Sequence, residues 1–323
     1  MRRSRGLLGN QHQPSGAPVT HESHITPLRC NYEGSHYQEA FWTTARRYED
    51  LAERAALRKL LPPVGRRIVE IGAGAGRLAD LYGQHEEVYL VDYARSQLDQ
   101  ARERWGADPR FTFVQADIYN LPFPDCYFDT VVTVRVLHHI KALGPAFDSI
   151  RRILRPGGIY VAEFANKRNL KAVIRYCLGC VKPGENPFGL DPYEFVPLNI
   201  DYHPAHLVWE LRQAGFDVAQ ELAVSFFRLG WLKEHLSATL LARLDSSLQA
   251  PLARLRLTPS IFLRAEACPL ADVPVDSSAR WRCPACHSTG IEMRPDTLIC
   301  LSCGSVYRII EGVVCMRCDE GFT

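Results

Sequence analysis

Residues 69–80, with the sequence VEIGAGAGRLAD, place Gly72, Gly74 and Gly76 directly after a short apolar run that is typical of a buried strand. Glycines at such a point let the backbone turn tightly and approach a ligand with no side chain between them. Loops of this kind occur in proteins that bind dinucleotides and in proteins that bind adenosyl compounds. The loop alone therefore predicts a nucleotide-type ligand without saying which one.

Two charged residues beside the loop favour a cationic ligand. The dinucleotide pattern G-x-G-x-x-G requires Gly or Ala at its sixth position, and this chain has Arg77 there. The carboxylate of Glu70, at the end of the strand, would repel a pyrophosphate but attract a ligand that carries an ammonium and a sulfonium group. Together they favour S-adenosylmethionine over a nicotinamide cofactor.

Acidic residues also end the next two predicted strands. Asp92 lies 20 residues after Gly72 and can accept hydrogen bonds from both hydroxyls of a ribose. Asp117 can meet the exocyclic amine of adenine, and Ile118 can pack on the adenine face. Each acid could instead cap a following helix, but carboxyl ends of parallel strands are where such ligands bind.

The rest of the chain alternates between strand and helix patterns, which predicts an α/β fold with a parallel sheet covered by helices on both faces. A hydrophobic fraction of 46% over 323 residues is typical of a globular protein with about two domains. A helix is expected before Pro62, and others in RSQLDQARERW (95–105) and PAFDSIRRILRPGG (145–158). The predicted strands are RRIVEIGA (66–73), EVYLVDYA (87–94), FTFVQADI (111–118), FDTVVTV (128–134) and GIYVAEFA (158–165).

Residues 66–165 resemble the class I S-adenosylmethionine-dependent methyltransferases, most closely the ubiquinone/menaquinone methyltransferase-like group. The resemblance rests on VEIGAGAGRLA, VDYARSQLDQAR, VQADIYNLPFPDCYFDTV, TVRVLHHI and ILRPGGIYVAEF. It implies a Rossmann-like sheet of seven strands whose last strand, in PSIFLRAEA (259–267), is antiparallel. It also implies a cofactor site lined by Glu70, Gly72, Gly74, Asp92, Asp117 and Ile118, to which we add their neighbours Ala73, Gly76, Tyr93 and Val134.

Methyl transfer from a sulfonium is an in-line displacement, and aligning the reactants can supply effective molarities of about 10⁵ M. A dedicated catalytic residue is therefore not required. His138 and His139 follow the fourth predicted strand and are candidate bases for a hydroxyl or phenol acceptor, or else they pack the following loop. Arg135, with Glu163 and Lys167, could orient an acidic acceptor. Family members often carry a small or polar residue at the position of Arg135, and many carry Asp at that of Glu70.

The C-terminal segment contains two CxxC pairs, Cys283-x₂-Cys286 and Cys300-x₂-Cys303, separated by thirteen residues. This spacing predicts one structural zinc ion held by four thiolates. The segment resembles the zinc-ribbon proteins that activate tRNA and protein methyltransferases, which implies stabilisation or a contact with another protein. The resemblance is carried by the CP-x-C start and by Tyr307, Ile309 and Gly312. Cys315 and Cys318 receive no role, and Cys177 and Cys180, on a predicted helix, are expected to be buried as small apolar residues.

Composition shifts divide the chain into a flexible N-terminal arm (1–35), a methyltransferase domain (36–267), a linker (268–279) and a zinc ribbon (280–318). Two insertions interrupt the methyltransferase domain. The aromatic segment 182–204 is either a lid over the substrate or a surface loop. The segment 230–257 has leucine at every fourth position from 232 to 252; we expect core packing, and the alternative is a cap that admits an apolar substrate or touches a membrane.

The net charge of +2 is low for a nucleic-acid or anionic-membrane partner, and no run reaches the roughly 18 apolar residues of a spanning helix. The basic N-terminus has no apolar core like that of a secretory signal, so a cytoplasmic protein is expected. The leading hypothesis is a methyltransferase that acts on a small, apolar or lipid-like acceptor. A methyltransferase of RNA or protein assisted by its ribbon, and a non-catalytic adenosyl-binding scaffold, stay open as alternatives.

Overall fold

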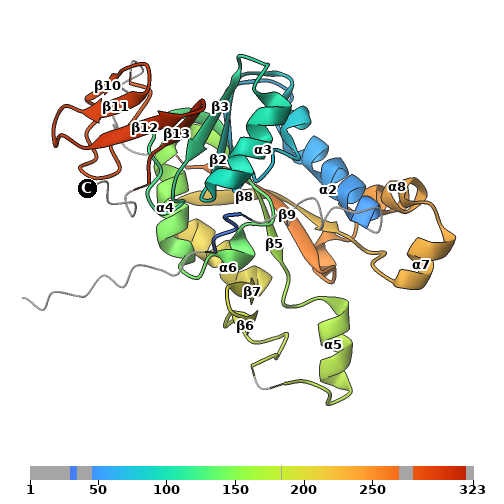
Figure 1. Ribbon diagram of the computed structural model, residues 1–323. Coiled ribbons are helices and arrows are strands. Elements are labelled where there is room, and N and C mark those ends of the chain that lie inside the picture. The colour runs from blue at the N-terminus through green and yellow to red at the C-terminus, as the bar shows by residue number, and fades with distance from the viewer. Residues whose placement is uncertain (1–29, 35–45, 183, 269–278, 318–323) are drawn as a thin grey trace, which may run out of the picture.

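The computed structural model describes residues 30–34, 46–182, 184–268 and 279–317 of the chain. These residues fold around one large β-sheet, which helices cover on both faces (Figure 1). Its strands lie in the order β10-β11-β12-β13-β3-β2-β1-β4-β5-β9-β8. The α/β architecture expected from the alternating strand and helix patterns is therefore confirmed.

The central part of the sheet contains seven strands. β1 to β5 are parallel to one another, whereas β9 runs antiparallel to both β5 and β8, as the resemblance implied for residues 259–267. The parallel strands are near-continuous apolar runs because both of their faces are buried. Their bounds are β1 (Gly65–Ile71), β2 (His85–Asp92), β3 (Phe111–Gln115), β4 (Phe128–Thr133), β5 (Leu154–Ala165), β8 (Phe216–Val224) and β9 (Ser260–Ala267).

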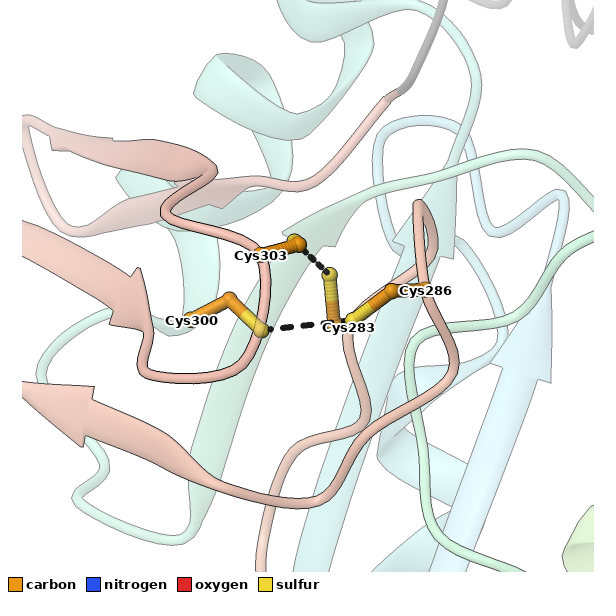
Figure 2. A group of neighbouring side chains, drawn as sticks. All are labelled: Cys283, Cys286, Cys300 and Cys303. Carbon is orange, nitrogen blue, oxygen red and sulfur yellow. Dashed lines mark hydrogen bonds between the residues drawn. The ribbon is translucent and has the colours of Figure 1, made fainter.

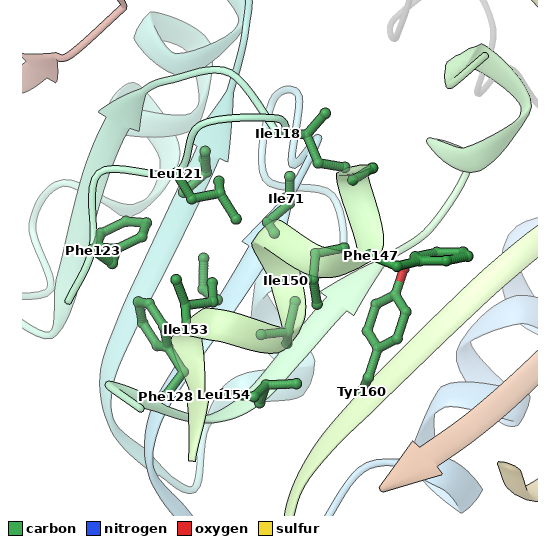
Figure 3. Packing of buried hydrophobic residues seen from close by; sticks show 14 of the residues in the cluster. Ile71, Ile118, Leu121, Phe123, Phe128, Phe147, Ile150, Ile153, Leu154 and Tyr160 are labelled. Atoms are coloured by element: carbon green, nitrogen blue, oxygen red, sulfur yellow. The ribbon is translucent and has the colours of Figure 1, made fainter. Parts of the chain in front are cut away.

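Alternate residues of each strand face opposite sides, which gives one hydrophobic core on each face of the sheet. Val69 and Ile71 belong to the core under α4 (Leu143–Ile153) and α6 (Pro204–Gln213), whereas Ile68 belongs to the core under α2 (Arg47–Leu60) and α3 (Arg95–Trp105). Figure 3 shows the first of these cores, where side chains of α4 pack over the strands. Its labelled residues include Ile71, Phe128, Phe147, Ile150, Ile153 and Tyr160.

The expected sheet of seven strands is wrong in its strand count, because the C-terminal segment adds four more. Its last strand, β13 (Val313–Cys315), pairs in parallel with β3, with Val313 opposite Phe113 and Cys315 opposite Gln115. Without this contact β3 would be an edge strand with a row of unpaired backbone groups. The other three strands are β10 (Ile291–Met293), β11 (Thr297–Cys300) and β12 (Val306–Ile310).

The predicted helices at α2, α3 and α4 are present, and α2 ends at Leu60, before the two prolines. The segment after the glycine loop forms one 3₁₀ turn, η2 (Ala79–Tyr82). Its bonds join residues three apart, such as Leu81 N to Leu78 O at 2.9 Å. Only thirteen residues separate β1 from β2, which leaves no room for a longer helix.

The second insertion folds into α7 (Gly230–His235), α8 (Ala238–Leu248) and η4 (Ala253–Leu255). The expectation that its leucine stripe packs into the core is wrong, because Leu240 and Leu244 are each 44% exposed. A neighbouring face of α8, with Leu241 and Asp245, lies against α2 instead. The hydroxyl of Tyr48 donates a hydrogen bond to Oδ2 of Asp245 at 2.5 Å.

The first insertion contains a hairpin of β6 (Tyr193–Val196) and β7 (Asn199–Asp201), and α5 (Leu170–Cys177) precedes it. The expected burial of Cys177 and Cys180 is wrong, because both are exposed. Most of the predicted N-terminal arm and linker lie outside the described residues, as does Cys318. Within the described residues, no helix is both long and apolar enough to cross a lipid bilayer.

The C-terminal ribbon shares the core of the central sheet. Trp281 is buried and stacks on Phe123 with ring centroids 5.9 Å apart, and both belong to the cluster under α4. Leu298 and Tyr307 of the ribbon belong to the same cluster.

We therefore expect Trp281→Ala to lower the free energy of unfolding of the whole chain by about 3–5 kcal/mol, through the cavity that it leaves. Denaturant-induced unfolding followed by far-UV circular dichroism measures this change. Leu301→Ala, at an exposed ribbon position, is the control and should have little effect. An unchanged main transition in Trp281→Ala would show that the ribbon unfolds independently of the sheet.

Candidate functional site

A cavity opens at the carboxyl ends of the parallel strands β1, β2, β3 and β4, where the glycine loop begins. Most of the residues expected to bind the cofactor line it, although they come from four separate segments of the chain. Gly76 is not among the lining residues. Those that are include Glu70, Gly72, Ala73, Gly74, Asp92, Tyr93, Asp117, Ile118 and Val134.

Two of the glycines have different roles. Gly72 has φ = +74°, and a Cβ built on it would lie 2.2 Å from Cγ2 of Val136, so no side chain fits between the loop and β4. Gly76 serves packing instead, since its carbonyl accepts a hydrogen bond from Nε1 of Trp105 at 2.9 Å and a Cβ would collide with the indole.

Glu70 carries a buried carboxylate whose raised pKa is offset only in part by Tyr82 and Arg77. The residue is 3% exposed and lines the cavity, and within the described residues its Oε2 has no hydrogen-bond partner. Burial raises the pKa of Glu70 to about 7. An unpartnered buried oxygen is costly, so this site is suited to a ligand that brings a cationic donor.

Asp92 is held in place by the backbone of the loop. Its Oδ2 accepts a hydrogen bond from Gly74 N at 2.8 Å, and its Oδ1 accepts one from Ala94 N at 2.9 Å. Burial raises the pKa of Asp92 to about 6, although these hydrogen bonds oppose the shift. Each carboxylate oxygen keeps a second lone pair, so the group can still accept hydrogen bonds from ribose hydroxyls.

Residues 30–34 lie over the mouth of the cavity, which the sequence did not indicate. Both carboxylate oxygens of Glu33 accept hydrogen bonds at the N-terminus of α3, from Arg95 N at 2.8 Å and Ser96 N at 3.0 Å. Cys30 and Tyr32 thereby join the lining. No periodicity or motif marks this segment, because it acquires its place through a helix cap on a distant element. Other lining residues that the sequence reasoning missed are Arg77, Leu78, Gln97, Tyr119, Val136 and Ile140.

Of the two candidate bases, His139 has the more informative environment. Its Nδ1 lies 2.6 Å from the carbonyl oxygen of Leu198, between β6 and β7, and its Nε2 lies 2.9 Å from the hydroxyl of Tyr32. A carbonyl only accepts, so Nδ1 carries the proton and Nε2 offers a lone pair. Burial lowers the pKa of His139 below its usual value, and it lowers that of His138 much further. Both rings are therefore neutral at pH 7.

The charged groups expected to orient an acidic acceptor are held by the protein itself. Arg135 lines the cavity, but its Nε donates to Oε1 of the fully buried Glu53 at 2.9 Å, and Arg77 Nη2 donates to Oε2 at 2.9 Å. Burial would raise the pKa of Glu53, but the two guanidinium groups hold it below its usual value.

Glu163 and Lys167 are held in the same way. Glu163 accepts hydrogen bonds from Arg135 N at 2.9 Å and Ser260 Oγ at 2.6 Å. Lys167 Nζ donates to the carbonyl oxygens of Gly189 at 3.2 Å and Asp191 at 2.6 Å. Because of these hydrogen bonds, both side chains already have partners within the protein.

A second candidate site lies in the ribbon, where the four predicted thiols converge from two loops (Figure 2). Their ligand atoms all lie within 4.8 Å of one another. The Sγ–Sγ distance is 3.7 Å between Cys283 and Cys303 and 3.4 Å between Cys286 and Cys300. A tetrahedral zinc ion with Zn–S bonds of about 2.3 Å requires Sγ–Sγ distances of about 3.8 Å, so this arrangement fits the ion.

Comparison with known proteins agrees with this geometry. Residues 69–162 match the family model of a methyltransferase domain. The chain is 30% identical over 212 residues to a probable S-adenosylmethionine-dependent methyltransferase of Mycolicibacterium smegmatis, an alignment that covers 65% of this chain and 70% of that protein. It is 33% identical over 168 residues to a ubiquinone/menaquinone biosynthesis C-methyltransferase of Pseudomonas entomophila, covering 47% of this chain and 66% of that relative, just under two thirds of its length.

Among solved structures, one chain of the complex between the Haloferax volcanii Trm112 methyltransferase activator and a methyltransferase superposes with a TM-score of 0.48. The sequence identity is 18%, and the superposition covers 69% of this chain and 91% of that one.

The buried carboxylates make a prediction about pH. Because burial raises the pKa of Glu70 to about 7 and that of Asp92 to about 6, both are ionised above these values and become protonated as the pH falls. Calorimetric affinity for S-adenosylmethionine should therefore be constant near pH 8 and fall below pH 7. Glu70→Gln should weaken binding at pH 8 by about 10- to 100-fold, the value of a charge-assisted hydrogen bond, and remove the part of the pH dependence near 7.

The exposed Glu86, on β2, provides a control, since Glu86→Gln should bind with unchanged affinity. A pH-independent affinity in the wild-type chain would contradict the assignment of the two carboxylates.

Proposed function

Because the chain belongs to the S-adenosylmethionine-dependent methyltransferases, we propose that its acceptor is a small or apolar molecule that enters the same cavity as the cofactor. The observation that carries this proposal is the chemistry of the lining beyond the cofactor residues. Tyr32, Tyr119, Val136 and Ile140 are neutral side chains, and the neighbouring histidines have lowered pKa values. The nearby charged groups of Arg135, Glu163 and Lys167 are bound within the protein, which argues against an acidic acceptor.

The proposed cofactor residues act by charge and shape. Glu70 would receive the ammonium group, Asp92 the ribose hydroxyls, and Asp117 with Ile118 the adenine. Gly72 and Gly74 let the backbone approach the ligand. The cofactor supplies an electrophilic methyl group on its sulfonium; the protein aligns this group with the acceptor and excludes water. Asp117 Oδ1 already accepts a hydrogen bond from Tyr119 N at 3.1 Å, which fixes the position of its side chain.

We further propose His139 as the base that removes a proton from a hydroxyl or acidic carbon of the acceptor. Nε2 faces the cavity side with its lone pair, and the Leu198 carbonyl stabilises the proton on Nδ1. The hydroxyl of Tyr32 either occupies the position at Nε2 that a hydroxyl of the acceptor would take, or it transfers the proton of the acceptor to Nε2. His138 has no comparable arrangement, and we assign it to packing. The side chain of Arg135 is held by Glu53, so we assign Arg135 a positioning role rather than a catalytic one.

The names of relatives support an apolar acceptor. Proteins 32–36% identical to this chain carry names for ubiquinone/menaquinone biosynthesis C-methyltransferases and a demethylmenaquinone methyltransferase. The alternative acceptors, RNA and protein, are separate outcomes of the following test.

Methyl-labelled S-adenosylmethionine incubated with the protein and a cell lysate should transfer label into the fraction that partitions into organic solvent. His139→Gln should reduce this transfer by about 10²-fold or more, with cofactor affinity unchanged, because a general base contributes about that much. The exposed His235 provides the control His235→Gln, which should retain full transfer. Label confined to RNA or protein would overturn the proposed acceptor. Label in no fraction would favour the alternative of a non-catalytic adenosyl-binding scaffold.

We also propose that the ribbon cysteines hold one structural zinc ion. Cys283 and Cys300 are buried, and Sγ of Cys283 lies 3.0 Å from the hydroxyl of Tyr307, which would stabilise a thiolate. Fewer than 40 residues make a poor core alone, so the metal would stabilise the ribbon together with its contact to β3.

Elemental analysis should find about one zinc ion per chain. Cys300→Ser should lose it and lower the thermal unfolding midpoint, since metal binding in such small modules is coupled to folding. Cys268→Ser, at an exposed cysteine outside the cluster, should keep both metal and midpoint. A chain that is folded through the ribbon yet free of zinc would refute the assignment.

A further inference from the structure

Helix α5 exposes a stripe of apolar side chains. Leu170, Ile174 and Leu178 follow one another at four-residue spacing, which places them along one side of the helix, and they are 50%, 48% and 70% exposed. No residue of α5 is buried. Figure 1 shows α5 standing away from the central sheet.

Two aromatic side chains lie outside this stripe. Tyr176, on another side of the helix, contacts Phe188 edge-on with ring centroids 5.4 Å apart, and both residues are exposed. We call the stripe of Leu170, Ile174 and Leu178 the α5 surface. Contiguous exposed apolar residues of this kind mark interaction sites.

Positive charge is concentrated around the α5 surface. Residues 168–182 include four Lys or Arg residues and no Asp or Glu, although the whole chain has a net charge of only +2. Lys171 and Lys182 are exposed, and the guanidinium of Arg168 lies 6.0 Å from the centre of the Phe188 ring. Arg175 is paired with Glu185. The chain therefore has a local basic surface although its net charge is low.

We propose that the α5 surface docks on a membrane that contains anionic lipids, with α5 lying in the plane of the interface. Apolar side chains enter the boundary between headgroups and acyl chains, and flanking lysines contact anionic headgroups. A symmetric contact with a second copy is less favourable, because it would bring the basic residues of both copies together. The exposed Leu229 and Trp231 at α7 lack this charge pattern, since Lys233 there is paired with Glu49 at 2.9 Å.

Docking would place the lipid surface at the helix from which the chain runs on to the β6–β7 hairpin. The Leu198 carbonyl of that hairpin holds His139, a lining residue of the cavity. This inference goes beyond the proposed function, because vesicle binding requires neither the cofactor nor an acceptor. It also supplies a route by which an apolar acceptor dissolved in a membrane would reach the protein.

Sedimentation of the full chain with phosphatidylcholine vesicles, with and without phosphatidylserine, tests the proposal. We expect binding to the anionic vesicles that weakens with added salt. The triple variant Leu170→Ser/Ile174→Ser/Leu178→Ser and the double variant Lys171→Glu/Lys182→Glu should each lower the vesicle affinity by about tenfold or more. Leu301→Ser, at an exposed ribbon position, is the matched control and should bind as the wild type does.

All of these positions are exposed, so the variants should keep the thermal midpoint and the affinity for S-adenosylmethionine. The proposal is overturned by absent binding, by equal binding to neutral and anionic vesicles, or by undiminished binding of either α5 variant. It is also overturned if the wild-type chain does not bind vesicles and the triple variant changes its oligomeric state. A chain that docks but methylates RNA would overturn only the proposed acceptor.

Discussion

The burial of two carboxyl groups at the same edge of the sheet is the constraint on which the site depends. β1 pairs with β2 in parallel, so Glu70 and Asp92, near the ends of these strands, open into the same cavity. Burial raises the pKa of both groups, and the charge of Asp92 raises that of Glu70 further. Within the described residues Oε2 of Glu70 has no hydrogen-bond partner, so a cationic ligand would supply an interaction that this carboxylate otherwise lacks.

The neighbouring charged groups, in contrast, are compensated by other residues of the protein. Glu53 is buried on α2 but lies between Arg135 and Arg77, so its charge is compensated inside the protein. Arg135 adopts φ = +59°, a conformation that non-glycine residues rarely take, and its backbone N–H is bound by Glu163. The cavity therefore contains the buried carboxylates of Glu70 and Asp92 together with a charged group, Arg135, that is neutralised inside the protein. This arrangement favours a cation beside the carboxylates and a neutral molecule beside the neutralised group.

The ribbon is part of the same body as the cofactor site. After β13, Arg317 places its guanidinium 3.9 Å from the centre of the Tyr93 ring and donates to the Tyr93 carbonyl oxygen at 3.2 Å. Tyr93 follows Asp92 directly and lines the cavity. Pairing of β13 with β3 also covers an edge that would otherwise expose its backbone groups. The ribbon thus supports the loop that carries Asp92, the residue proposed to bind the ribose.

The sequence alone determined the α/β class, the central strands, the glycine loop and the four-cysteine cluster, because these depend on local patterns: apolar runs, short spacings and special backbone conformations. It also indicated Glu70 and Asp92, since strand ends can be read from such runs. Tertiary structure alone decided which elements meet. Tyr32 reaches His139 through a helix cap by Glu33, Arg135 is held by Glu53 from another helix, and β13 extends the sheet at β3. These contacts join residues distant in the chain through hydrogen bonds and buried charge, and no local pattern encodes such pairings.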